Sequence, residues 1–287
     1  MVSEVVRIKE IAARMRSDIV KMITLAGSGH PGGSLSAADI VATIYFGDVL
    51  RYRADQPDWP GRDRFILSKG HAAPVLYSAL ARAGYFESAE LATLRKLGSR
   101  LQGHPDSQKL PGVEISTGSL GQGLSIAAGL AYGLKMNADE YEHATQQVYV
   151  LLGDGELQEG QVWEAAMFAA HNKLDNLIAI VDYNNLQIDG ALDDVVGLGD
   201  IAKKFSAFGF FTLTIDGHDI KAIREALTEA RDYQEGPVCI IAQTIKGKGV
   251  SFMENQAQWH GKAPSAEQCD SALAVLAAYC TTGEEVF

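Results

Sequence analysis

The sequence predicts an α/β fold in which a mostly parallel sheet carries helices on both faces. Two observations predict it: short apolar runs alternate with helical segments in the second half of the chain, and helical periodicity dominates the first half. Strand, helix and strand in succession require crossover connections, which give parallel strands covered by helices. We expect one domain over residues 1–262 and a weakly structured tail over residues 263–287 that contains a short helix.

Apolar spacing predicts three helices in the first half of the chain. The first is N-terminal, the second covers residues 35–50, and the third, at residues 124–136, is rich in small residues that suggest close packing. The apolar residues that recur every three or four positions in the first helix are Ile8, Ile11, Ala12, Met15, Ile19 and Met22. A strand at residues 64–68 is expected between the second and third helices.

Four apolar runs predict the remaining strands, at residues 148–152, 177–181, 211–215 and 238–242. A helix is expected between the first two at residues 160–174, and another between the last two at residues 219–233. The second of these helices has an apolar face made of Ile220, Ile223, Leu227 and Ala230. This alternation is typical of a parallel sheet.

Composition excludes several classes of protein. Apolar residues make up 47% and charged residues 21% of the 287 residues, as in ordinary globular proteins. The net charge of −11 argues against a nucleic-acid or membrane partner. The three cysteines, Cys239, Cys269 and Cys280, form no CxxC pair, and no apolar run reaches the roughly 20 residues of a membrane span. We therefore expect a cytoplasmic protein.

A carboxylate between two glycines follows the strand at residues 148–152, as Gly153-Asp154-Gly155. Ligands bind beyond the carboxyl ends of parallel strands, and the next strand places Asn184 at an equivalent end. Oxygen ligands of this kind suit Mg²⁺ or Ca²⁺. The glycines let the backbone approach an anion, toward which the helix expected from Gly160 would point its positive end. The triplet alone is more often a turn, so its spacing to Asn184 is what favours a metal and an anion.

Gly-Asp-Gly followed by Asn184-Asn185 across one strand–helix–strand unit resembles the signature of thiamine-diphosphate enzymes. Five stretches, in family order and spanning nearly the whole chain, resemble transketolase in particular. They are GSGHPGGSLSAADI (27–40), FILSKGHAAPVLY (65–77), GHPDSQKLPGVEISTGSLGQGLSIAAG (103–129), GDGELQEGQVWEA (153–165) and DGHD (216–219). The resemblance implies the thiamine-diphosphate-binding fold of the domain that holds the diphosphate. One departure is Ser119, where full-length relatives usually carry Pro.

The resemblance also implies the site residues. Mg²⁺, or Ca²⁺ or Mn²⁺ in its place, would be held by Asp154, Asn184 and the Leu186 carbonyl. The cofactor would lie against His71, Gly118, Leu120, Gly153 and Gly155. The histidines that would line the substrate channel and move protons are His30, His71, His104 and His260. Glu159 and Glu164 would face another subunit, whereas His143, His171 and His218 are expected to be structural.

A dinucleotide site is not expected, although residues 27–32 fit G-x-G-x-x-G, because the segment before them has the period of a helix and not of a strand. No P-loop pattern G-x-x-x-x-G-K-[ST] is present either.

The implied activity is transfer of a two-carbon ketol unit from a ketose, phosphorylated in our expectation, to an aldose. In the family, the glutamate that activates the cofactor belongs to a pyrimidine-binding domain, and this sequence contains no such domain. We therefore expect an N-terminal subunit that pairs with a C-terminal subunit as α₂β₂. The alternatives are a truncated chain, a subunit of a 2-oxoacid decarboxylase or dehydrogenase, and a non-catalytic regulatory subunit. Pentose phosphates, branched sugars and sulfosugars all remain open as substrates.

Overall fold

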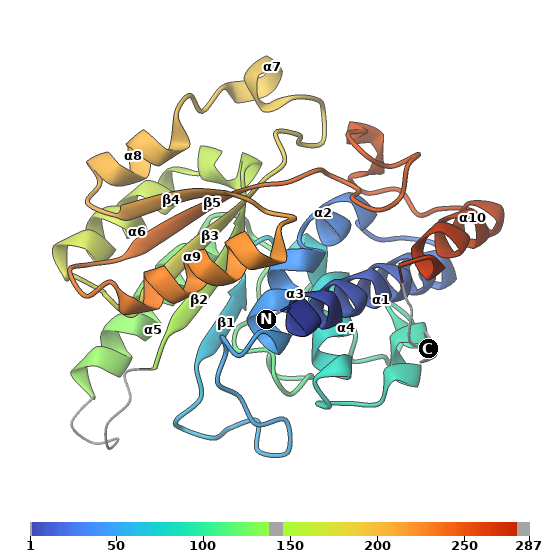
Figure 1. The fold of residues 1–287 in the computed structure, drawn as a ribbon, viewed down its shortest axis with the longest axis horizontal. Helices are drawn as coiled ribbons and strands as arrows, with labels where there is room; N and C mark the ends of the chain where they lie inside the picture. The colour runs from blue at the N-terminus through green and yellow to red at the C-terminus, as the bar shows by residue number, and fades with distance from the viewer. Residues whose placement is uncertain (1, 138–145, 280–287) are drawn as a thin grey trace.

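A five-stranded parallel sheet runs through the middle of the molecule, as the computed structural model shows for residues 2–137 and 146–279 (Figure 1). The strands lie in the order β1-β2-β3-β5-β4, and every neighbouring pair is parallel. They are β1 (Arg64–Leu67), β2 (Val148–Gly153), β3 (Leu177–Tyr183), β4 (Phe211–Asp216) and β5 (Val238–Gln243). All five expected strands are confirmed, with C-terminal ends that shift by one or two residues.

Each face of the sheet has its own hydrophobic core, because successive strand residues point to opposite sides. On β3, Ile178 and Ile180 belong to one core, and Ala179 and Val181 to the other. The first core packs against α1 (Val2–Ala26), α3 (Ala38–Phe46), α4 (Ala73–Arg82) and α9 (Ile220–Asp232). The second packs against α5 (Gln122–Met136), α6 (Gly160–His171) and α8 (Ile201–Ala207). Helices therefore cover both faces, as the sequence predicts.

The single helix expected over residues 35–50 is wrong in its bounds. The chain instead forms α2 (Pro31–Ser36) and α3, which are separated at Ala37. The Ser36 hydroxyl donates a hydrogen bond to the Asp182 carboxylate at 2.5 Å, which ties the end of α2 to β3. After Phe46 the helix stops at Gly47, where a Cβ would lie 2.5 Å from the Thr43 carbonyl oxygen. The break brings the backbone of α2 toward the ends of the strands.

The helices around the second strand pair agree with the sequence. The helix rich in small residues is α5, and it packs against α6. The predicted apolar face of α9 is buried at all four positions, Ile220, Ile223, Leu227 and Ala230. The sequence did not predict α7 (Leu192–Val196) or α8.

The segment after residue 262 is not weakly structured over its described part. It forms α10 (Ala266–Ala277), which begins with a capping box between Ser265 and Gln268. The helix lies along α1 (Figure 1) and buries Cys269, Ala272 and Leu276. The short helix is thus confirmed. The tail was expected to be weakly structured, and this expectation is wrong for its described part, because α10 packs against α1. The division of the chain at residue 262 stays a prediction.

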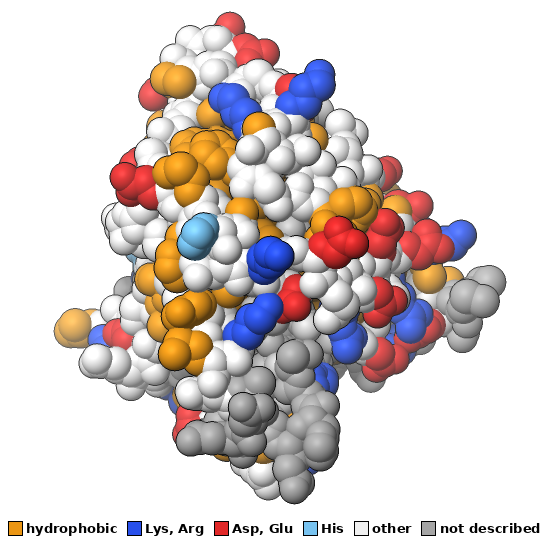
Figure 2. Space-filling view, turned by 90° about the vertical axis from the view of Figure 1, so that its left-hand side faces the viewer, with side chains coloured by type: hydrophobic (Ala, Val, Ile, Leu, Met, Phe, Trp, Pro, Cys, Tyr) orange, Lys and Arg blue, Asp and Glu red, His pale blue; other side chains and the backbone are white. Residues whose placement is uncertain are grey.

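One face of the molecule carries a band of exposed hydrophobic side chains, on the side where α5 and α6 lie in Figure 1 (Figure 2). Tyr132 and Met136 on α5 and Met167 and Phe168 on α6 are all exposed, and the Tyr132 and Phe168 rings lie 5.7 Å apart. We call these four residues the α5–α6 face. Among the helices of residues 2–137 and 146–279, none combines the length and hydrophobicity needed to cross a membrane.

Candidate functional site

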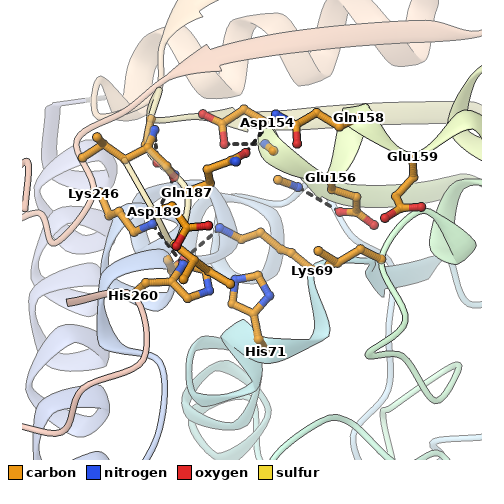
Figure 3. A pocket seen from close by; sticks show the side chains of 17 residues that line it. Lys69, His71, Asp154, Glu156, Gln158, Glu159, Gln187, Asp189, Lys246 and His260 are labelled. Carbon is orange, nitrogen blue, oxygen red and sulfur yellow. Dashed lines mark hydrogen bonds between the residues drawn. The ribbon is translucent and has the colours of Figure 1, made fainter. Parts of the chain in front are cut away.

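A cavity of about 230 Å³ opens at the carboxyl ends of β2 and β3 (Figure 3). The residues that line it come from α2, the turn after β1, the turn before α5, the ends of β2 and β3 with the loops that follow them, and the segment after β5. Its lining includes Gly33, Lys69, His71, Leu120, Gly153, Asp154, Gly155, Glu156, Glu159, Asn184, Leu186, Gln187, Ile188, Asp189, Lys246 and His260. We call this cavity the crevice.

Asp154 follows β2 directly and is buried in the wall of the crevice. Its carboxylate oxygens accept hydrogen bonds from the Gly155 N–H at 2.8 Å and the Asn185 N–H at 2.5 Å. Burial, together with the negative charge of Asp182, raises the pKa of Asp154 to about 6. A cation beside this carboxylate would stabilise its ionised form.

The end of β3 supplies two more oxygens to the crevice. Asn184 Oδ1 accepts a hydrogen bond from the Leu186 N–H at 3.2 Å, and the Leu186 carbonyl accepts one from Lys246 Nζ at 3.0 Å. Both residues line the crevice together with Asp154. The three groups expected to bind a metal therefore share one cavity, while their role as ligands stays a prediction.

Two buried lysines also line the crevice, and the sequence analysis missed both. In Figure 3 the side chains of Lys69 and Lys246 point toward each other across it. Lys69 is paired with the buried carboxylate of Asp182 and donates to the Gly33 carbonyl at 2.9 Å. Burial lowers the pKa of Lys246 to about 8, so this ammonium is still charged near neutral pH. Lys69 belongs to the SKGHA stretch at residues 68–72, so its place in that motif is the sequence feature that could have identified it as a site residue.

Glu156 is a third buried charged residue that the sequence analysis missed. Its carboxylate accepts hydrogen bonds from the Ser68 hydroxyl, from the Gly121 N–H at 2.8 Å and from the Gly153 N–H at 3.0 Å. These donors belong to the ends of β1 and β2 and to the start of α5. Glu156 thus holds together three of the segments that surround the crevice.

Four histidines meet beside the crevice. His71 and His260 line it, with ring centroids 4.9 Å apart. The His30 ring lies 5.3 Å from His71 and 5.4 Å from His260, and 6.5 Å from His104. All four histidines expected in a substrate channel are therefore neighbours, although they come from sequence positions up to 230 apart, from His30 to His260.

The surroundings of this cluster keep its imidazoles neutral. Burial is the largest cause, and the positive charge of nearby side chains adds to it. The pKa of His30 falls to about 4 and that of His260 to about 3. The pKa values of His71 and His104 are also lowered. Near neutral pH, each ring can therefore both donate and accept one hydrogen bond.

The other residues expected at the cofactor or at a subunit interface lie in separate parts of the structure. Gly118, with φ 153°, lies against the His104 ring, where a Cβ would be 3.0 Å from Cδ2, while Leu120 lines the crevice. Glu159 lies on the crevice and is exposed, and Glu164 is exposed on α6. Their roles at a cofactor or a subunit interface stay predictions.

The other histidines differ from the cluster. His218 Nδ1 lies 2.7 Å from the Asp39 carboxylate, and its Nε2 accepts the Ile245 N–H at 2.8 Å, which agrees with the structural role expected for it. His171 is exposed at the end of α6, and His143 lies outside the described residues.

The crevice suits a metal bridged to a diphosphate better than a metal held by protein alone. Among the described residues, no group of three or more His, Cys, Asp and Glu side chains is placed to hold a metal ion. One carboxylate, one amide and one carbonyl oxygen suit Mg²⁺ that takes its other ligands from phosphate and water. The two lysines would then face the phosphate oxygens. At Gly155 a Cβ would lie 3.0 Å from Oε1 at the flexible end of the Gln187 side chain, so the backbone at this wall packs closely against Gln187.

Comparison with known proteins agrees with this chemistry. Residues 8–278 match the family described as "Transketolase, thiamine diphosphate binding domain". The 6-deoxy-6-sulfo-D-fructose transketolase subunit SqwG of Clostridium sp. (strain MSTE9) is 41% identical over 273 residues, which is 93% of this chain and 97% of that protein. Transketolase of Homo sapiens is 44% identical over 255 residues, which is 89% of this chain but 40% of the human protein.

Solved structures show the same relationship. The transketolase of Campylobacter jejuni superposes with a TM-score of 0.87 at 36% identity, over 94% of this chain and 42% of that one. A Pichia stipitis transketolase variant superposes with a TM-score of 0.88 at 31% identity, over 95% of this chain and 43% of that one. The chain thus spans about two fifths of the length of these full-length relatives, and nearly all of SqwG.

Proposed function

Because this chain belongs to the transketolase family, whose thiamine-diphosphate-binding domain it matches over residues 8–278, we propose that it is the N-terminal subunit of a two-chain transketolase. The assembled enzyme moves a two-carbon ketol unit from a ketose to an aldose. The observation that carries the proposal is the meeting of Asp154, Asn184 and the four histidines at one crevice.

In this proposal the crevice holds Mg²⁺ and the diphosphate end of thiamine diphosphate. Asp154, Asn184 and the Leu186 carbonyl bind the metal, for which Ca²⁺ and Mn²⁺ are the substitutes to test. Gly118, Leu120, Gly153 and Gly155 pack against the cofactor, and His71 with the two lysines binds its diphosphate. When bound, thiamine diphosphate supplies the nucleophilic carbon and the electron sink of the reaction.

The histidine cluster would act on the sugar. His30, His104 and His260 surround the space next to His71, and each is neutral near pH 7. As a group they hydrogen-bond the hydroxyls of the ketose and of the aldose acceptor, and the cluster moves protons at those oxygens. Four converging imidazoles beside the crevice favour this role over a non-catalytic regulatory subunit, which has no need of them.

A second chain would complete the site. By the family resemblance it carries the pyrimidine-binding domain with the activating glutamate, and two chains of each kind form α₂β₂. The exposed carboxylates of Glu159 and Glu164 and the α5–α6 face support an interface on this side of the molecule. We also propose a cytoplasmic location, because the described cysteines are free thiols.

The substrate is proposed only by class. SqwG is by its name a 6-deoxy-6-sulfo-D-fructose transketolase subunit, so a sulfonated ketose should be tested beside phosphorylated ones. Both carry a terminal anion, and no arginine lines the crevice among residues 2–137 and 146–279. The second chain would supply that contact. Discrimination between phosphate and sulfonate would then be a property of the assembled enzyme.

The proposal is tested by isolating this chain from its own cells with thiamine diphosphate and Mg²⁺ present. A second chain is expected to copurify, and the eluate is expected to transfer ketol units from at least one phosphorylated or sulfonated ketose. The His30→Ala and His260→Ala variants should assemble but turn over at least tenfold more slowly. Decarboxylation of a 2-oxoacid without ketol transfer would instead favour the rival thiamine enzyme.

A further inference from the structure

Arg95 lies outside the crevice but touches the histidine cluster. Its Nη2 is 3.4 Å from His30 Nδ1, and its Nη1 donates to the Ser28 hydroxyl at 3.5 Å. The guanidinium also lies across the backbone of Gly103, where a Cβ would be 3.1 Å from Arg95 Cζ. Two segments of the chain, one at Ser28 and His30 and the other at Gly103, therefore hold this side chain in place.

The backbone of Arg95 is held in an unusual conformation. Its φ of 60° lies in the left-handed region, which residues with a side chain rarely adopt. The Arg95 N–H donates to the Leu101 carbonyl at 2.9 Å, which closes the loop after the 3-10 helix η2 (Ser88–Thr93). The loop conformation thus directs this particular side chain toward His30.

Arg95 differs from the other arginine of its loop in what it pairs with. Arg100 makes two hydrogen bonds to the Glu90 carboxylate, at 2.6 Å and 2.8 Å. Over the described part of the chain, Arg95 meets no carboxylate, and its hydrogen bonds go to a hydroxyl and an imidazole. An ion pair therefore does not explain its position.

The contact determines which nitrogen of His30 carries the proton. A guanidinium has five N–H donors and no acceptor, and it does not deprotonate in proteins. His30 Nδ1 can therefore only accept in this hydrogen bond, so a neutral His30 keeps its proton on Nε2. Within the part of the chain that the structure describes, the charged and titratable groups around the ring are Arg95, His71, His104, Lys246 and His260, and none of them is an acid.

We propose that Arg95 is a positioning residue that keeps His30 in the tautomer with its proton on Nε2, so that His30 donates a hydrogen bond to an oxygen of the sugar. The part of this inference that concerns the sugar rests on the proposed function. His30 then stabilises negative charge that develops on that oxygen during C–C cleavage, and does not remove a proton from it. Proton removal is left to the other imidazoles of the cluster.

The tautomer can be measured without substrate or turnover. Long-range ¹H–¹⁵N correlation spectra of the full chain, labelled with ¹⁵N-histidine near neutral pH, distinguish the protonated from the unprotonated ring nitrogen. The His30→Gln variant assigns the signals. We expect a protonated Nε2 and an unprotonated Nδ1 in the wild type, and a mixture of tautomers in Arg95→Met. Arg95→Lys should restore the wild-type pattern, because an ammonium also donates to Nδ1.

Arg100→Met is the matched control, since it removes a guanidinium from the same loop without touching His30. It should leave the His30 signals unchanged. A proton on Nδ1 in the wild type, or an unchanged pattern in Arg95→Met, would overturn the proposal. This outcome is independent of whether the chain is a transketolase.

The effect of Arg95 on catalysis is measured in the complex with the second chain. Arg95→Met should lower kcat for ketol transfer by about tenfold to a hundredfold, as expected when a transition-state donor is misplaced. The affinity for thiamine diphosphate should not change. If kcat is unchanged while the tautomer shifts, His30 does not act as the donor, and this part of the inference is wrong. If the wild-type complex transfers no ketol unit at all, it is the proposed function that fails.

Discussion

Lys69, in the wall of the crevice, forms a buried ion pair with Asp182 at the end of β3. The Asp182 carboxylate also accepts hydrogen bonds from Ser36 at 2.5 Å and from Thr244. Burial alone would raise the pKa of Asp182, but the Lys69 ammonium and these hydrogen bonds hold it below its usual range. One carboxylate thus joins α2, the turn after β1 and the loop after β5 to the end of β3.

Removal of either partner of this pair should be costly. Because Lys69→Met leaves the Asp182 charge buried without its cation, we expect a loss of about 3–5 kcal/mol of unfolding free energy. Urea unfolding of the cofactor-free chain measures it. Lys135→Met is the control, since its pair with Asp175 is partly exposed and should contribute at most about 1 kcal/mol. Equal losses in the two variants would contradict the account.

Stability should depend on pH through the histidine cluster. The folded pKa of His30 is about 4, below its value of 6.5 in the unfolded chain, so the unfolded state binds more protons between these values. The contribution of His30 to the unfolding free energy should therefore be fully present above pH 6.5 and should fall by about 1–3 kcal/mol as the pH drops toward 4, against the opposite trend from Asp154, whose pKa is raised. His30→Gln should show a smaller fall. A steeper fall in the variant would refute the assignment.

Lys246 should contribute specifically to the binding of the diphosphate. Lys246→Met is expected to weaken thiamine-diphosphate binding by at least about tenfold, because a buried ammonium near the phosphate oxygens is lost. Isothermal titration of the complex in Mg²⁺ measures this. Lys248→Met, two positions along the chain, removes an ammonium that lies outside the crevice lining and serves as control. Equal weakening in both variants would indicate a general charge effect.

Two glycines of α5 should respond oppositely to alanine. A Cβ at Gly123 would lie 2.8 Å from the Ser68 Cα, a backbone atom that cannot move aside, so Gly123→Ala should cost about 1–3 kcal/mol. A Cβ at Gly129 would meet nothing within 4 Å, so Gly129→Ala should stabilise the chain by up to about 1 kcal/mol. Thermal unfolding of both variants tests the close packing of α5 on β1. Stabilisation by both substitutions would argue against that packing.

The strands and most helices could be predicted because their signal is local. The apolar run of β2 and the one-sided face of α9 are visible in short windows of sequence, and parallel connections then follow from their order. The break at Ala37 was not predicted in this way, and the hydrogen bond beside it, from Ser36 to Asp182, joins residues far apart in the sequence. The packing of α10 on α1 is also a contact between distant parts of the sequence, so a short window could not predict it.

The residues of the candidate site likewise fall into two groups: those that local sequence could predict and those whose positions depend on distant contacts. Asp154 and Asn184 could be placed together because each follows a strand of one parallel sheet. Lys69, Lys246 and Glu156 were missed because lysine and glutamate are usually exposed, and only their distant partners explain their burial. The contact of Arg95 with His30 depends on a loop conformation that composition does not reveal.

We propose above that this chain supplies the metal- and diphosphate-binding half of a ketol-transfer site and that a second chain completes it. The most direct measurement is ketol transfer by the two purified chains, mixed at varied ratios with thiamine diphosphate and Mg²⁺. We expect no turnover by either chain alone, turnover that saturates at a one-to-one ratio, and its loss in Asp154→Ala. Full turnover by one chain alone, or unchanged turnover in Asp154→Ala, would contradict the claim.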